Sequence, residues 1–184
     1  MKILQFVQTI DESIVLWVSS HLRNEFFDFL MPIVSALGNL GILWIILGMM
    51  IILFGKGKKQ KMWGFLLLVC LAVTAVISNF LIKPIIQRMR PFDKLFLEIL
   101  IQKPHDFSFP SGHTSAAFAV ATVLYIYNKK VGIFMYLFAF LMAFSRLYLL
   151  VHYPSDILIG ALIGTGISWC ITKAAQKKWG GNDS

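Results

Sequence analysis

Long apolar runs constrain the fold of this chain more than any other feature. Four of them, at 62–82, 112–128, 131–151 and 154–172, approach the roughly 20 residues that a helix needs to cross a bilayer. A fifth, 40–54, is short alone but extends backwards through FFDFLMPIVSALGN. Because a helix satisfies its own backbone hydrogen bonds in lipid, the sequence predicts an all-α, polytopic membrane helical bundle.

The first 38 residues leave the number of spans open. Either 3–20 or 26–38 supplies a sixth spanning helix, and six transmembrane helices are expected in total. The stretch MKILQFVQTIDESIVLWVSS carries Asp11 and Glu12 and has no long apolar core, so it is a poor signal peptide. An amphipathic helix on the membrane surface is the better interpretation. With 184 residues, the whole chain is expected to form one domain.

The net charge of +8 comes largely from lysines that flank the apolar runs. Such a bias is typical of loops on the cytoplasmic side of a membrane, and nucleic-acid binding is not expected. If the five clearest spans alternate, the lysine-rich loops and the C-terminus are cytoplasmic, whereas 83–111 and 151–155 face outward. The lysines are Lys56, Lys58, Lys59, Lys61, Lys129, Lys130, Lys173, Lys177 and Lys178.

Three further features have structural interpretations. Cys70 and Cys170 lie far apart in apolar runs, without a CxxC pattern, so neither a disulfide nor a zinc site is expected. Gly160 and Gly164 have the spacing that permits close helix packing. The stretch FDKLFLEILIQK, residues 92–103, has apolar residues at helical spacing and predicts a short helix on the outer interface, with a simple connector as the alternative.

Polar groups near membrane depth are functional candidates, because burying them in lipid is costly. The first group is KPIIQRMRP, residues 83–91. If the preceding helix continues through it, Lys83 and Arg90 share a face while Arg88 points elsewhere. The alternative is a set of cations that snorkel to the interface from a helix end.

The second group, PSGH at 110–113, directly precedes the apolar run of a predicted span. Ser111 is a good N-cap residue, Gly112 permits close backbone approach and His113 falls in the first turn. The free N–H groups of such a helix start bind anions. A capped helix with an interfacial histidine is the alternative.

The third group is SRLYLLVHYPSD, residues 145–156. His152 and Asp156 are four residues apart, so the carboxylate can fix the tautomer of the imidazole and leave its other nitrogen free to attack. Arg146 lies nearby, and the alternative is a structural Arg–Asp pair beside a polar histidine. The three alternatives together require three unrelated coincidences at one membrane face, whereas fixed cations with two histidines favour phosphoryl transfer.

The three groups resemble the signature of the type 2 phosphatidic acid phosphatase (PAP2) superfamily. K-x6-R-P, P-S-G-H and S-R-x5-H-x3-D are all matched in order and spacing, although the N-terminal third carries no part of the signature. The resemblance implies a membrane lipid phosphatase of six helices that needs no metal and no other cofactor.

The resemblance also implies roles for individual residues. His152 would be the nucleophile that forms a phosphohistidine, Asp156 would orient it, and His113 would protonate the leaving oxygen and later activate water. The phosphate oxygens would be held by Lys83, Arg90, Ser111, Gly112 and Arg146. Arg88, His105 and Asp106 are expected to be ordinary interfacial residues.

The expected substrate is a lipid phosphate or pyrophosphate in the surrounding membrane, with undecaprenyl pyrophosphate first and phosphatidylglycerophosphate or phosphatidic acid next. The chain would then lie in the cell membrane with its active site outward, and no obligate protein partner is expected. Two rival hypotheses are a protein that transports or binds phospholipids without cleaving them and a relative of the soluble vanadium haloperoxidases. The apolar runs argue against the second.

Overall fold

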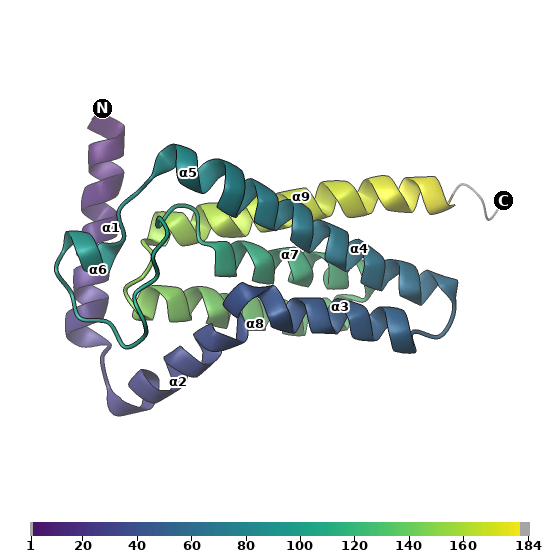
Figure 1. The fold of residues 1–184 in the computed structure, drawn as a ribbon, viewed down its shortest axis with the longest axis horizontal. Helices are drawn as coiled ribbons and strands as arrows, with labels where there is room; N and C mark the ends of the chain where they lie inside the picture. Colours follow the sequence, from purple (N-terminus) through teal and green to yellow (C-terminus); the bar gives the residue numbers. More distant parts are fainter. Residues whose placement is uncertain (1, 181–184) are drawn as a thin grey trace.

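Long helices packed side by side form the body of the protein in the computed structural model, which describes residues 2–180 (Figure 1). α7 (Gly112–Tyr127) lies at the centre, because it packs against the two helices that follow it and against α4. The all-α fold predicted from the apolar runs is confirmed. The other long helices of this bundle are α3 (Ile42–Phe54), α4 (Lys58–Ala75), α8 (Lys129–Tyr148) and α9 (Pro154–Gly180).

The close approach of α7 and α9 depends on the two glycines of GALIGTG. A Cβ atom on Gly160 would lie 2.7 Å from the carbonyl oxygen of Ser111, and one on Gly164 would lie 2.1 Å from that of Ser115. Any larger side chain would push the helices apart. The predicted packing role of these glycines is therefore confirmed, and it fixes the start of α7 against α9.

Three helical segments are long and apolar enough to cross a membrane: Lys58–Lys94, Lys129–Tyr148 and Pro154–Lys178. A fourth span results if the bent pair Glu25–Leu37 and Asn39–Phe54, which meet at 42°, counts as one. α7 has only 16 residues. The segments correspond to three of the predicted spans, and the bent pair contains the predicted run 40–54.

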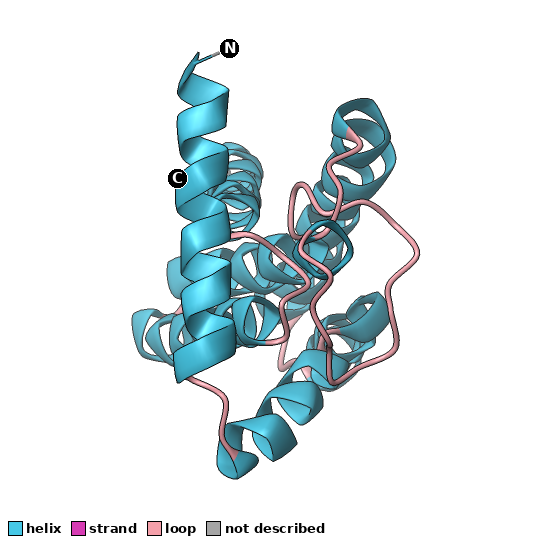
Figure 2. Ribbon diagram, turned by 90° about the vertical axis from the view of Figure 1, so that its left-hand side faces the viewer, coloured by secondary structure: helices cyan, strands magenta, loops and turns pink. Residues whose placement is uncertain are grey.

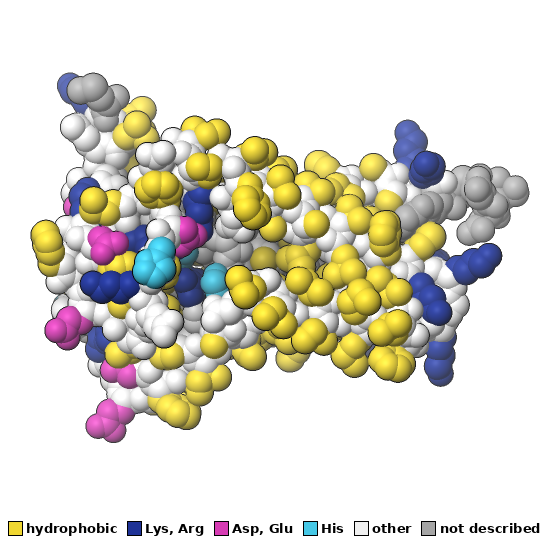
Figure 3. Space-filling model, viewed as in Figure 1, with side chains coloured by type: hydrophobic (Ala, Val, Ile, Leu, Met, Phe, Trp, Pro, Cys, Tyr) yellow, Lys and Arg dark blue, Asp and Glu magenta, His cyan; other side chains and the backbone are white. Residues whose placement is uncertain are grey.

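Exposed side chains divide the molecule into three zones along its long axis (Figure 3). On the face shown, hydrophobic side chains cover the middle of the bundle. Lysines gather at the end where α3, α7 and α9 finish, and acidic, basic and histidine side chains gather at the opposite end. A chain with such an apolar zone and several candidate spans is an integral membrane protein.

The N-terminal helices occupy the end of the bundle opposite the lysines. α1 (Lys2–His21) lies across that end rather than along the bundle (Figures 1 and 2). Its residues Val15 and Val18 are buried, whereas Ile3 and Phe6 are exposed, so apolar side chains lie on both the packed and the exposed parts of this helix. α2 (Glu25–Leu37) then leads through the 3₁₀ turn η1 (Asn39–Gly41) into α3.

The prediction of a helix at 92–103 is wrong. α6 (Pro91–Lys94) ends after one turn, and Phe96 has a φ of 53° in the left-handed region. The chain beyond it is irregular, and burial alternates: Leu95, Leu97, Ile99 and Ile101 are partly buried, whereas the residues between them are exposed. These side chains pack on apolar clusters beneath α1 and α8. The apolar residues therefore follow the period of two of an extended chain, not the helical period of 3.6.

Candidate active site

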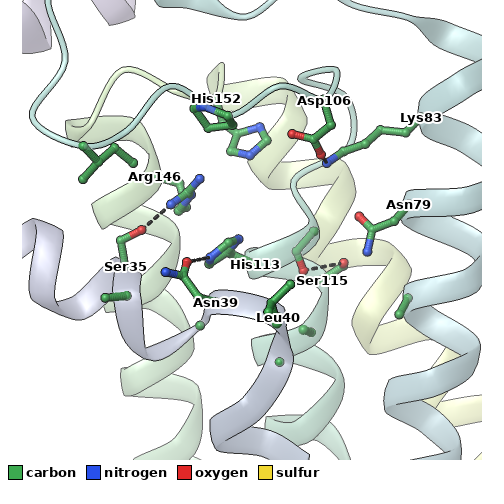
Figure 4. A pocket seen from close by; sticks show the side chains of 18 of the residues that line it. Ser35, Asn39, Leu40, Asn79, Lys83, Asp106, His113, Ser115, Arg146 and His152 are labelled. Atoms are coloured by element: carbon green, nitrogen blue, oxygen red, sulfur yellow. Dashed lines mark hydrogen bonds and ion pairs between the residues drawn. The ribbon is translucent and has the colours of Figure 1, made fainter.

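A cavity of about 1210 Å³ lies at the end of the bundle that α1 crosses (Figures 3 and 4). All three polar groups found in the sequence contribute to its wall. Ser111 and Asp156 are fully buried next to this wall. The candidate residues that line the cavity itself are Lys83, Arg90, Gly112, His113, Arg146 and His152.

Lys83 and Arg90 converge without sharing a helix face, which corrects the sequence prediction. The π-helical segment η2 (Val76–Ile82) and the single turn α5 (Lys83–Ile86) end at Gln87, which has a φ of 50°. Arg90 follows in extended conformation. Its guanidinium donates to the Val151 carbonyl oxygen at 2.6 Å, which carries it to the same cavity as Lys83.

Asp106 joins these two cations, so the expectation of an ordinary interfacial residue is wrong. Its carboxylate pairs with the Lys83 ammonium and, at 2.7 Å, with Arg90 Nη2. Burial alone would raise the pKa of Asp106, but the hydrogen bond and charge of Lys83 and the charge of Arg90 hold it well below its usual range. The side chain is still 54% exposed, which places this carboxylate at the cavity mouth.

Arg146 approaches from the last turn of α8 on the opposite side. Its side chain is buried and donates through Nη1 to the hydroxyl of Ser35 on α2. Within residues 2–180 its Nε finds no hydrogen-bond partner. Figure 4 shows its guanidinium pointing toward the same space as His113 and His152. Three cations thus face one cavity from three different segments.

The start of α7 forms the floor between them. The Ser111 hydroxyl accepts from the Thr114 N–H at 3.5 Å, so the predicted N-cap is confirmed. A Cβ on Gly112 would lie 2.6 Å from Asn79 Oδ1 of η2, so a larger residue there would require the Asn79 side chain to move. His113 Nε2 lies 3.0 Å from Asn39 Oδ1 in the turn before α3. Gly112 and His113 of this first turn line the cavity, and the free N–H groups of a helix start can bind an anion.

His152 lies in the turn between α8 and α9, and the predicted contact with Asp156 is present but long. His152 Nδ1 is 3.6 Å from Asp156 Oδ2, and Nε2 is 3.3 Å from Arg90 Nη1. Since an arginine can only donate, Nε2 accepts and Nδ1 carries the proton toward the carboxylate. Burial, followed by the charges of Arg90 and Arg146, lowers the pKa of His152 well below its usual value. The imidazole is therefore neutral, and its Nε2 lone pair accepts from Arg90 at the cavity wall.

Asp156 has stronger partners than the histidine. Its Oδ2 accepts from the Ser108 hydroxyl at 2.5 Å and from the Tyr153 N–H at 2.9 Å. Its Oδ1 accepts from Arg88 Nη1 at 2.5 Å. The expectation that Arg88 is an ordinary interfacial residue is therefore wrong. Ser108 carried no sequence signal, because a serine in an irregular segment has no pattern that marks it.

The remaining candidates add no metal centre. His105 lines the cavity mouth and is exposed. In the part of the chain that the structure describes, no group of three or more His, Cys, Asp or Glu side chains is arranged to hold a metal ion. Positive charge in this site is supplied by side chains, an arrangement that suits an anion with several oxygens.

Comparisons with known proteins point to one family. A family model described as the PAP2 superfamily matches residues 63–180. The chain is 31% identical over 141 residues to the undecaprenyl-diphosphatase BcrC of Bacillus subtilis, covering 77% of this chain and 70% of the relative. It is 33% identical over 129 residues to phosphatidylglycerophosphatase B of the same organism, covering 62% and 61%. The crystal structure of a transmembrane PAP2 type phosphatidylglycerolphosphate phosphatase from Bacillus subtilis superposes with a TM-score of 0.77 at 27% identity, covering 93% and 87%.

Proposed function

This chain belongs to the PAP2 superfamily and is a membrane lipid phosphatase, and we propose that it hydrolyses a lipid pyrophosphate through a phosphohistidine on His152. Undecaprenyl pyrophosphate is the first candidate substrate, and undecaprenyl phosphate and inorganic phosphate are the products. The observation that carries the proposal is the convergence of three cations and two histidines on one cavity.

The cations bind the phosphoryl group that is transferred. Lys83, Arg90 and Arg146 reach its oxygens from three sides, and the Gly112 N–H at the start of α7 adds a donor. Ser111 holds that helix start in place. Fixed positive charge of this kind stabilises the oxygens of a phosphoryl transition state without reorganisation. The same role needs no metal ion.

His152 Nε2 is the proposed nucleophile. Its lone pair attacks phosphorus, a phosphorus–nitrogen bond forms and the bond from phosphorus to the leaving oxygen breaks. The ring then carries a positive charge, which the nearby Asp156 carboxylate stabilises at Nδ1. A neutral imidazole with its proton on Nδ1 is the form that this step requires.

His113 is the proposed general acid and base. Its proton goes to the leaving oxygen in the first step. It then removes a proton from water, whose oxygen attacks the phosphohistidine and releases phosphate and neutral His152. Its place on the cavity wall, between Arg146 and Lys83 in Figure 4, supports this role. The variant His113→Ala is expected to lose about 10²- to 10⁴-fold in kcat.

The lipid part of the substrate fits the apolar side of the cavity. Leu40, Ile45, Leu68 and Leu71 line it between the turn before α3 and the middle of α4. Phosphatidylglycerophosphate is the second candidate, favoured by the similarity to phosphatidylglycerophosphatase B and to the transmembrane phosphatase structure. Phosphatidic acid would use the same contacts.

The orientation proposed for the membrane places this cavity outward. The lysine-rich loops lie at the other end of the bundle, and lysine bias marks the cytoplasmic side. The three segments that pass alone, the bent pair α2–α3 counted as one span and α7 would make five spans. α1 lies across the end of the bundle (Figure 1), so the sixth span stays a prediction. A cysteine introduced at Lys103 should react with an impermeant reagent in intact cells, and protection would reverse the orientation.

The test is phosphate release by the purified protein in detergent from undecaprenyl pyrophosphate, phosphatidylglycerophosphate and phosphatidic acid. We expect release in EDTA, with the highest kcat/KM for undecaprenyl pyrophosphate. A higher value for phosphatidylglycerophosphate would make that lipid the substrate. Activity that EDTA removes and Mg²⁺ restores would contradict the mechanism.

A further inference from the structure

Asp11, a residue outside the three motifs, joins α1 to the start of α9 through its buried carboxylate. Asp11 is only 2% exposed although α1 is a surface helix. Its Oδ1 accepts from the Ser155 N–H at 3.0 Å, and its Oδ2 accepts from the Ser155 hydroxyl at 2.5 Å and from Arg88 Nη2 at 2.6 Å. Gln8, one turn earlier, accepts from the same Nη2 at 2.6 Å.

Arg88 uses its other amino group on the site itself. Nη1 donates to Asp156 Oδ1 at 2.5 Å and to the Ser155 hydroxyl at 2.7 Å. The guanidinium carbon also lies 4.0 Å from the centre of the Tyr153 ring. One planar guanidinium therefore connects a carboxylate of α1 with the carboxylate beside His152, a geometry that arginine supports and lysine does not.

The two contacts depend on each other for physical reasons. Arg88 follows the left-handed Gln87 in a segment without helical hydrogen bonds, so the local backbone does not fix its side chain. Asp156 is fully buried, and an uncompensated buried charge is strongly destabilising, so its carboxylate needs a charged partner. His152 Nδ1, at 3.6 Å, is too far to be that partner alone. Asp11 holds Arg88 and Arg88 neutralises Asp156.

We propose that Asp11 and Arg88 are positioning residues of the phosphatase reaction, which hold Asp156 under Nδ1 of His152 so that Nε2 faces the phosphate. The inference rests on the proposed role of His152 as nucleophile. Arg88 and Asp11 do not line the cavity, and the three cations that bind phosphate are outside this network. Replacing Asp11 or Arg88 should therefore lower kcat and leave KM unchanged.

The matched control is the next residue of the same helix. Glu12 pairs with Lys94 of α6 at 2.6 Å, so it too joins α1 to the chain after α5, but it has no contact with Asp156. Asp11→Asn and Glu12→Gln each remove one negative charge and one ion pair from α1 with almost no change of shape. Only the first removes a direct contact with Arg88. Glu12 reaches the network only through Gln8, whose Nε2 donates to Glu12 Oε1 at 2.7 Å, and the amide oxygen of a glutamine can still accept that bond.

The experiment measures kcat and KM of the full-length protein in detergent with undecaprenyl pyrophosphate and with phosphatidic acid. For Asp11→Asn we expect kcat to fall about 10- to 100-fold, because small misplacements of a reacting group cost this much, with KM within about 2-fold. Glu12→Gln should keep the wild-type kcat. Arg88→Met should lose more than Arg88→Lys, which retains one charge beside Asp156.

Each outcome decides between the hypotheses when His152→Ala is measured in the same series. If His152→Ala still releases phosphate, the proposed function fails. If it is inactive while Asp11→Asn and Arg88→Met keep the wild-type kcat, only the positioning role is overturned. An equal loss in Glu12→Gln, or a rise in KM instead of a fall in kcat, would also overturn it. Should Asp11→Asn not fold, Arg88→Lys carries the same test through its kcat and KM.

Discussion

Two aspartates near the cavity have the same chemistry and opposite surroundings. Asp106 lies on the irregular segment before α7, is half exposed and contacts Lys83 and Arg90, the cations proposed to bind phosphate. Asp156 lies in the first turn of α9, is fully buried and contacts Arg88, which does not line the cavity. Burial and the identity of the partner, not residue type, separate the two.

This difference in burial indicates which of the two carboxylates a substrate phosphate can displace. An ion pair that water reaches is worth about 0.2–1 kcal/mol, so phosphate oxygens can take Lys83 and Arg90 from Asp106 at little cost. Breaking a buried pair costs about 3–5 kcal/mol, because one charge is left uncompensated. We therefore expect substrate to displace Asp106 from the two cations, whereas Asp156 should stay paired with Arg88.

The largest effect on activity is expected at His152, the histidine whose Nδ1 faces Asp156. His152→Ala removes the proposed nucleophile, and we expect phosphate release to fall by about 10⁶-fold. Circular dichroism in detergent should show the helical content of the wild type. Substantial turnover in a folded variant would remove the basis for assigning Asp156 a role in the reaction.

Replacing each aspartate by asparagine is the direct test of the comparison. Asp156→Asn keeps the shape but leaves Arg88 without one of its two carboxylate partners and the imidazolium without a carboxylate. We expect kcat to fall about 10³- to 10⁴-fold, as when the buried acid of a catalytic triad is replaced in this way. Steady-state kinetics with undecaprenyl pyrophosphate measure it, and a loss confined to KM would argue that Asp156 belongs to the binding side instead.

The same substitution at Asp106 should have a small effect of opposite sign. Asp106→Asn removes a competitor for the two cations, so KM should fall about 1.5- to 5-fold, the factor that 0.2–1 kcal/mol represents, while kcat changes little. Inhibition by inorganic phosphate should strengthen by the same factor. If KM rises instead, Asp106 holds the cations in place for substrate rather than competing with it.

The sequence predicted one of these two aspartates and missed the other for a physical reason. Asp156 stands four residues after His152, and helical spacing brings such residues together. Asp106 meets Lys83 and Arg90 only because the chain between them runs as an irregular strap, and no periodicity marks where that strap returns. The motif residues converge because they lie near helix ends at the same end of the bundle. Spans that alternate in direction already place them there.

The contacts of α1 were beyond prediction for the same reason. Asp11 and Arg88 are 77 residues apart, and their meeting depends on α1 crossing the end of the bundle, a matter of tertiary packing. Gly160 and Gly164 could be interpreted from sequence because their spacing refers to a single helix. Local patterns thus gave the spans and the motifs, while the ion pairs that connect them needed the fold.

The smallest expected effect is on stability in acid. Because the pKa of Asp106 in the folded protein lies below its ordinary value near 3.8, its ion pairs stabilise the fold above about pH 4, and this contribution is lost as the pH falls further. Asp106→Asn has no such contribution to lose. Its unfolding temperature should lie below that of the wild type by at most about 4 °C near neutral pH, from 1 kcal/mol in a chain of this size. The gap should shrink toward pH 3 in thermal unfolding in detergent, and a gap that widens in acid would mean that Asp106 is protonated, not ionised, beside Lys83 and Arg90.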